Sequence, residues 1–180
     1  MYISELATSI KPNILTSLEE RRAELAMEGK DIINLSIGTP DIPPAPHIIQ
    51  ALIKAAEDPE NYKYTITIPH AAAIAAITGP QDQVALNRLV YRERRDAFCS
   101  ALRDIGWDVP MTPATMFTWF HLPDGETDSD IFCRTLLEKA GVMCVPGSYF
   151  GNGGNDYVRF ALTKSPEILR EAASRIGEFI

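Results

Sequence analysis

Residues 142–163 read VMCVPGSYFGNGGNDYVRFALT, and this stretch decides what kind of fold the chain adopts. An apolar run from Val142 to Val145 predicts a short buried strand, and the segment from Asp156 to Thr163 predicts a second one. The loop between them contains four glycines, and we interpret it as a plain hairpin-like connection. Its backbone N–H groups could also bind an anion. The known glycine-rich phosphate-binding motifs do not apply, however, because in them the loop leads into a helix, whereas this loop leads into a strand.

Helical spacing of apolar residues appears on both sides of this stretch. Further strands are predicted at 32–37 and 115–122, and residues 64–68 favour strand as well. Helices are expected over residues 13–28 and 80–106. Four more are expected: one between Pro46 and Pro59, one that begins at Ala71, one that ends before Gly141, and one that begins after Ser165–Pro166. The pattern predicts an α+β fold in which helices cover a small sheet.

Two helix starts have recognisable capping residues. Thr127 and Asp130 have the spacing of a capping box, so Thr127 is the expected N-cap of the helix that Gly141 closes. Ser165 followed by Pro166 is the typical start of the final helix.

Length and composition limit the classes of function. The 180 residues suffice for one ordinary domain, and a net charge of −7 disfavours nucleic-acid binding. No secretory signal or apolar run long enough for a membrane helix is visible, so the chain is expected to be cytoplasmic. The three cysteines and three histidines lack metal-ligand spacing, so we predict reduced thiols and no metal site.

Arg159 is the most informative candidate for chemistry. Strand alternation sends Val158, Phe160 and Leu162 to one face and Arg159 to the other. A guanidinium in that position could donate two hydrogen bonds to a carboxylate. Spacing alone leaves open that Arg159 is solvated on an open sheet face or paired with a nearby acid. No arrangement typical of nucleophilic or acid–base catalysis stands out, so we predict no catalytic residue.

Several ordered motifs together resemble aspartate-type and LL-diaminopimelate-type aminotransferases of the class I and II family. The N-terminal ones are IINLSIGTPDIPPAPHIIQAL and YKYT. The others are AAIAAITGPQD, YRERRDAFCSALRDIGW, PATMFTWFHLP, GVMCVPGSYFG and YVRFALT. The resemblance implies the small domain of that family, built from its N- and C-terminal segments.

The same resemblance implies roles for individual residues. The arginine of the YVRFALT motif, Arg159, would bind the substrate α-carboxylate. Gly38, with Ile37 beside it, would lie against that carboxylate through its backbone. Tyr64 would reach the phosphate of the family cofactor, pyridoxal phosphate, usually in the neighbouring subunit.

The chain departs from the family pattern after Thr65. Residues 1–65 resemble the N-terminal arm and the first part of the small domain, and residues 66–180 resemble the rest of that same domain. The central cofactor domain is therefore expected to be missing, with a junction at about 65–69. Its Schiff-base lysine motif would be missing too, and we predict no pyridoxal phosphate chemistry on the remaining lysines, which are Lys11, Lys30, Lys54, Lys63, Lys139 and Lys164.

Three functional hypotheses follow. The first is a truncated member of the family that binds amino or 2-oxo acids weakly and does not transaminate alone. The second is one part of a split aminotransferase that needs a separately encoded large domain. The third is a deletion product without function, whose exposed interface would favour a homodimer or aggregation.

Overall fold

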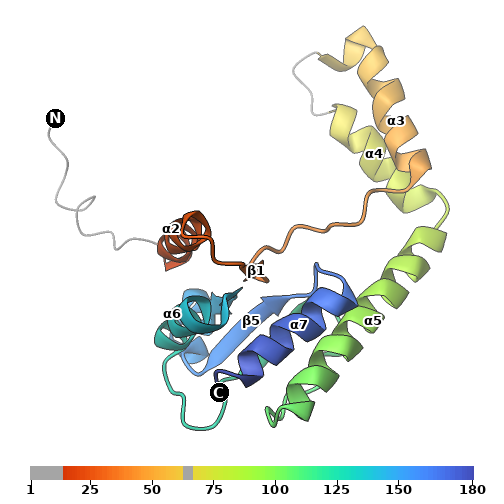
Figure 1. The fold of residues 1–180 in the computed structure, drawn as a ribbon. Helices are drawn as coiled ribbons and strands as arrows, with labels where there is room; N and C mark the ends of the chain where they lie inside the picture. The colour runs from red at the N-terminus through yellow and green to blue at the C-terminus, as the bar shows by residue number, and fades with distance from the viewer. Residues whose placement is uncertain (1–13, 63–66) are drawn as a thin grey trace, which may run out of the picture. The chain divides into compact units, whose positions relative to one another are not determined.

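The computed structural model describes residues 14–62 and 67–180, and it divides the chain into two compact units (Figure 1). The first unit combines Met1–Thr39 with Glu93–Ile180, and the second is Pro40–Arg92. Among the described residues, none of the helices combines the length and apolar character needed to cross a bilayer. The six α-helices that the structure describes are α2 (Ile14–Met27), α3 (Pro46–Glu57), α4 (Thr67–Thr78), α5 (Asp82–Asp104), α6 (Ser129–Ala140) and α7 (Pro166–Gly177).

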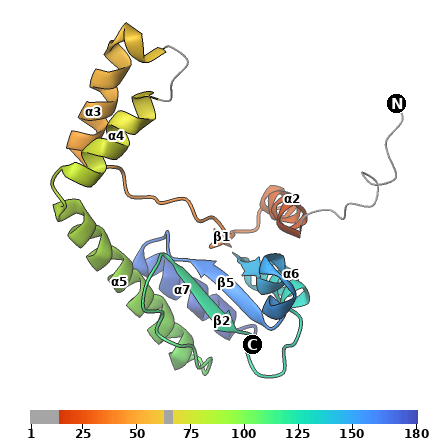
Figure 2. The ribbon, with the colours of Figure 1, turned by 180° about the vertical axis from the view of Figure 1, so that it is seen from behind.

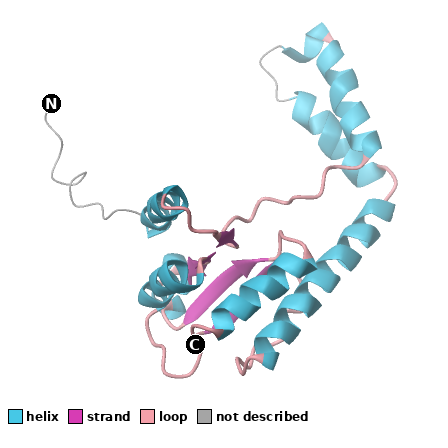
Figure 3. Ribbon diagram, in the orientation of Figure 1, coloured by secondary structure: helices cyan, strands magenta, loops and turns pink. Residues whose placement is uncertain are grey.

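Among the described residues of the first unit, five short strands form two small sheets, and Figure 3 shows how short they are beside the helices. The strands are β1 (Ile33–Asn34), β2 (Phe117–His121), β3 (Val142–Met143), β4 (Val145–Pro146) and β5 (Tyr157–Ala161). Strand β1 pairs with β3 in parallel, and β5 lies between β2 and β4 with antiparallel pairing to both. The predicted α+β fold with a small sheet and covering helices is confirmed.

The core of the first unit lies between the sheets and helices α5, α6 and α7. Alternation along β2 and β5 turns Phe120 and Phe160 inward, and both are fully buried. Trp107, which follows α5, packs edge-on against Phe120, Phe132 and Phe160 with ring centroids 5.9–6.2 Å apart. Its indole N–H donates to the His121 carbonyl over 3.0 Å, so the one polar atom of this ring is satisfied.

The opposite face of the three-stranded sheet, which we call the uncovered face, carries no helix of the described first unit. Figure 2 looks onto β2 and β5 from this side, and no helix of the described first unit lies in front of them. Trp119 of β2 points to this side and is partly exposed, while its neighbours Thr118 and Phe120 are buried. Outward-pointing side chains of β2 therefore reach solvent on this face.

Helix α6 starts one residue later than the capping box predicted. Its N-cap is Asp128, whose carboxylate accepts from the backbone N–H groups of Asp130 and Ile131. The prediction of Thr127 was therefore wrong, because an aspartate at the next position satisfies the same free N–H groups. Gly141 ends α6 in the left-handed conformation and Ser165 caps α7, both as predicted.

Three strand predictions need correction, and the first is 32–37, of which only Ile33–Asn34 form a strand. The run 142–145 is not one strand, because Cys144 separates β3 from β4, which belong to different sheets. Thr67 and Ile68, predicted as strand, begin α4, which therefore starts before Ala71. Pro69 is compatible with this start, since a first-turn residue needs no hydrogen bond from its nitrogen. Residues 64–66 lie outside the described residues.

The second unit has little interior of its own. Helices α3 and α4 pack on each other, and the 3₁₀ turn η1 (Pro59–Tyr62) follows α3. Among its described residues, Ala45 alone is buried. These units divide the chain at 39/40 and 92/93, whereas the expected junction at 65–69 falls inside the second unit. The assignment of 1–65 and 66–180 to one small domain stays a prediction.

Candidate functional site

Arg159 lies in the middle of β5 and points away from the core. Its neighbours Val158 and Phe160 are fully buried on the core side, whereas Arg159 is partly exposed on the other. The strand alternation predicted from the sequence therefore places this guanidinium on the uncovered face of the sheet.

The segment after β1 runs alongside β5 and supplies a backbone partner for Arg159. The guanidinium Nη2 donates to the Ser36 carbonyl over 3.1 Å, across 123 positions of sequence. Ser36 is itself held, because its N–H and its hydroxyl both donate to Asn34 Oδ1 over 2.9 and 2.7 Å. The Ala161 N–H donates to the Leu35 carbonyl over 2.7 Å, which fixes this segment against β5.

Two aromatic rings hold the guanidinium from other directions. The Arg159 Cζ atom lies 4.4 Å from the centroid of the Phe117 ring and 4.9 Å from that of Phe150. Both distances are within the range of a cation–π interaction. Trp119 packs edge-on against Phe150 with centroids 5.4 Å apart, so Phe150 is itself supported by a neighbouring ring. These contacts fix the orientation of the Arg159 guanidinium.

Arg159 has a charge that nothing in the described part of the chain neutralises. No acidic side chain described in the structure forms an ion pair with it, and its buried Nε atom lacks a hydrogen-bond partner. Burial lowers the pKa of the guanidinium, because desolvation disfavours its charged form. A partly buried, unpaired cation is costly, and a carboxylate bound there would offset that cost.

Gly38 and Ile37, the other two described residues predicted for this site, lie close to it. A methyl group built on Gly38 would overlap Phe117 Cζ and come within 2.7 Å of Phe117 Cε1. Gly38 therefore provides the space in which the Phe117 ring rests against Arg159. Ile37 has an exposed side chain, and its carbonyl accepts from the Thr163 hydroxyl over 3.3 Å. Tyr64 lies outside the described residues, and its predicted role stays untested.

Sequence reasoning missed the side chains that surround the guanidinium. Phe117 shares with Trp119 the outward alternation of β2, so the strand pattern could have placed it on the same face as Arg159. Phe150 lies in the 3₁₀ turn η2 (Gly147–Phe150), where no periodicity indicates its direction. The roles assigned to these residues and to Arg159 in ligand binding are predictions.

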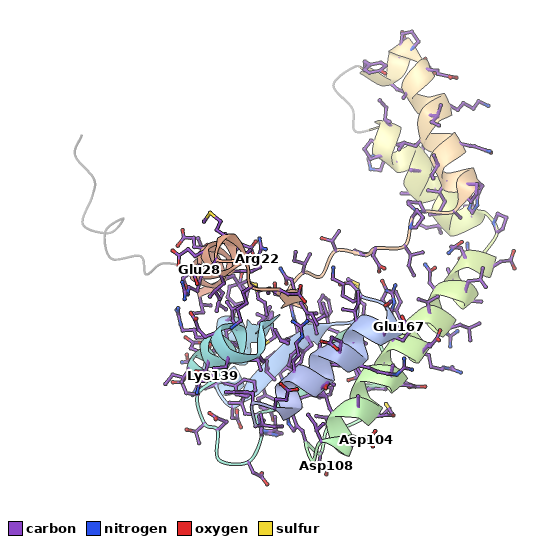
Figure 4. The ribbon with its side chains drawn as sticks, viewed as in Figure 1. Arg22, Glu28, Asp104, Asp108, Lys139 and Glu167 are labelled. Carbon is purple, nitrogen blue, oxygen red and sulfur yellow. The ribbon has the colours of Figure 1, made fainter. Side chains whose placement is uncertain are left out.

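A hollow of about 480 Å³ lies at the end of α6 and is less suited to a ligand. Three of its charged groups are already engaged: Arg175 pairs with Asp31 at 2.6 Å and with Glu171 at 2.9 Å, and the Lys30 ammonium donates to the Glu138 carbonyl. Lys139, also on its rim, is labelled in Figure 4 among charged side chains on the outside of the helices. Arg159 therefore remains the better candidate site.

Comparison with known proteins gives consistent results. The family model described as aminotransferase class I and II matches residues 61–176. An LL-diaminopimelate aminotransferase from Moorella thermoacetica is 44% identical over 105 residues, which are 58% of this chain and 27% of that protein. The structure of substrate-bound BacF from Bacillus subtilis matches with a TM-score of 0.60 and 30% identity, over 64% of this chain and 30% of that one.

The likeness extends beyond the part matched by the family model. A crystal structure from Silicibacter pomeroyi, assigned to the aminotransferases, matches over 99% of both chains with a TM-score of 0.71. Because the identity there is 12%, this match shows a shared fold alone. The chain spans about a quarter of the length of the curated relatives, with 27% for the Moorella thermoacetica protein.

Proposed function

The chain belongs to the class I and II aminotransferase family, and from this premise we propose that it is a truncated member that binds the carboxylate of an amino or 2-oxo acid and does not transaminate by itself. The observation that carries this proposal is the unpaired guanidinium of Arg159 on the uncovered sheet face. Binding is expected to be weak, because one wall of a site encloses little of a small ligand.

The described lysines do not fit the family cofactor, pyridoxal phosphate. Its chemistry needs a desolvated amine that forms an imine with the cofactor aldehyde. Lys54 and Lys139 are exposed, Lys30 donates to the Glu138 carbonyl, and Lys164 is not buried. Lys11 and Lys63 lie outside the described residues. None of the described lysines therefore offers the desolvated amine that this cofactor requires.

Trapping with borohydride tests this part of the proposal. After incubation with pyridoxal phosphate and reduction, we expect adducts that are substoichiometric and spread over several exposed lysines. Intact-mass measurement followed by peptide mapping gives both the stoichiometry and the positions. The full-length Moorella thermoacetica relative, treated in parallel, is the control for a single stoichiometric adduct. One fully modified lysine in the purified chain would show that the proposal is wrong.

The apolar surface of the second unit favours a second candidate, a split aminotransferase. Helix α4 reads TIPHAAAIAAIT, carries no acidic or basic residue except His70, and is apolar all round. Such helices are normally buried, yet Ile74 is 61% and Ile77 is 78% exposed. A separately encoded large domain, corresponding to the part of the relatives that this chain does not span, would cover this surface.

Complementation tests the split arrangement. The central segment of the Moorella thermoacetica relative would be expressed alone and mixed with this chain and pyridoxal phosphate. If the second candidate holds, transamination appears on mixing, and Ile74→Glu with Ile77→Glu reduces it at least about tenfold, because charges at a buried interface are costly.

Ile131→Glu is the matched control, because Ile131 is 61% exposed on α6 of the first unit. If mixtures of this chain with the central segment are inactive and the chain forms homodimers, the split arrangement is contradicted. The exposed apolar surface of α4 would then serve self-association. A chain that neither binds carboxylates nor complements would be a deletion product without function.

A further inference from the structure

Cys133 and Cys144 lie in contact inside the first unit. Their sulfur atoms are 3.3 Å apart, and each side chain is 1% exposed. Cys133 is on α6, and Cys144 is the residue between β3 and β4. The left-handed turn at Gly141 reverses the chain after α6, which brings the two thiols together although they are eleven positions apart in sequence.

The contact is close to what a disulfide needs. A disulfide has a sulfur–sulfur bond of about 2.05 Å, so the two atoms need to approach by little more than an ångström. Helix α6 packs against both β3 and β4, the strands on either side of Cys144. The two backbone segments that carry the cysteines are therefore already packed against each other, as a cross-link between them requires.

The residues described around Cys133 and Cys144 favour redox chemistry of the two thiols over metal binding by them. Within residues 14–62 and 67–180, no group of three or more His, Cys, Asp or Glu side chains could hold a metal ion. We propose that Cys133 and Cys144 form a modification site, at which a small disulfide of the glutathione class oxidises the pair to an intrachain disulfide. The bond would join α6 covalently to the segment that enters β4.

Oxidation of the pair takes two thiol–disulfide exchange steps. One cysteine sulfur attacks the small disulfide, forms a mixed disulfide and releases one small thiol. The second cysteine sulfur then displaces the other half and releases a second small thiol. The protein loses two electrons and two protons, and the small disulfide is reduced to two thiols that take up both protons.

The burial of both sulfurs governs how fast this reaction proceeds. Desolvation and the neighbouring Cys144 raise the pKa of the Cys133 thiol, so little thiolate is present in the folded chain. The oxidant also has to reach atoms with almost no exposed surface. We therefore expect slow oxidation of the folded chain and faster oxidation while the chain folds.

Thiol counting on the full chain tests the proposal in two arms. Reduced protein is exposed to glutathione disulfide either folded or during refolding from denaturant, and remaining thiols are alkylated in denaturant. The expected product has lost two alkylatable thiols, retains one at Cys99, and yields a peptide that links Cys133 to Cys144. Cys99→Ser should give the same cross-link, whereas Cys133→Ser and Cys144→Ser should abolish it.

The two outcomes separate clearly. A Cys133–Cys144 peptide in either arm, from wild type or from Cys99→Ser, supports the modification site. Three alkylatable thiols in both arms, or cross-links that involve Cys99 or join two copies of the chain, would overturn it. Because Cys99→Ser leaves the pair untouched, the test does not depend on whether the Cys133 and Cys144 variants fold.

Discussion

Replacing Arg159 with methionine is expected to weaken binding of a 2-oxo acid by about 10- to 100-fold, the range that hydrogen bonds to a charged group usually contribute. Methionine keeps much of the apolar stem but removes every donor of the guanidinium. The fold should change little, because an unpaired and partly buried cation is costly and its loss removes that cost. NMR titration of labelled protein with pyruvate measures the affinity.

Two controls make this result specific to Arg159. Arg175→Met removes another arginine, one already paired with Asp31 and Glu171, and should leave pyruvate binding unchanged. Pyruvamide, which lacks the negative charge, should bind neither protein measurably. Equal affinity of wild type and Arg159→Met for pyruvate would show that the carboxylate does not bind at this arginine.

Gly38→Ala should affect both stability and binding. The added methyl group would overlap the Phe117 ring, and overpacking of this kind usually costs about 1–3 kcal/mol. The ring that has to move is the one 4.4 Å from Arg159 Cζ, so pyruvate affinity should fall as well. Urea unfolding followed by tryptophan fluorescence measures stability, since Trp107 and Trp119 both lie in the first unit.

A second-site variant tests whether the effect passes through Phe117. Gly38→Ala combined with Phe117→Leu removes the colliding ring atoms and should recover most of the lost stability. Pyruvate affinity should stay low, because the cation–π contact is lost. Gly153→Ala is the matched control, since a methyl group there meets nothing within 4 Å. If Gly38→Ala and Gly153→Ala behaved alike, Gly38 would have no steric role.

Features that depend on neighbouring residues could be predicted from the sequence. Alternation along residues 157–162 already implied that Arg159 points away from the core, and the structure agrees. Gly141 and Ser165 end and begin their helices as predicted, because a cap depends on a single turn of chain. The prediction of the N-cap of α6 was wrong because two adjacent residues can both accept hydrogen bonds there, and it is Asp128, not Thr127, that accepts from the free N–H groups.

Contacts between distant parts of the chain were decided by the tertiary structure alone. The sequence shows that Arg159 faces outward, but not that the Ser36 carbonyl accepts from it or that Phe117 and Phe150 hold it. Local periodicity fixes which face a side chain occupies, because it depends on backbone geometry over a few residues. Which other segment meets that face depends on how sheets and helices pack, and residues 123 positions apart become neighbours only then.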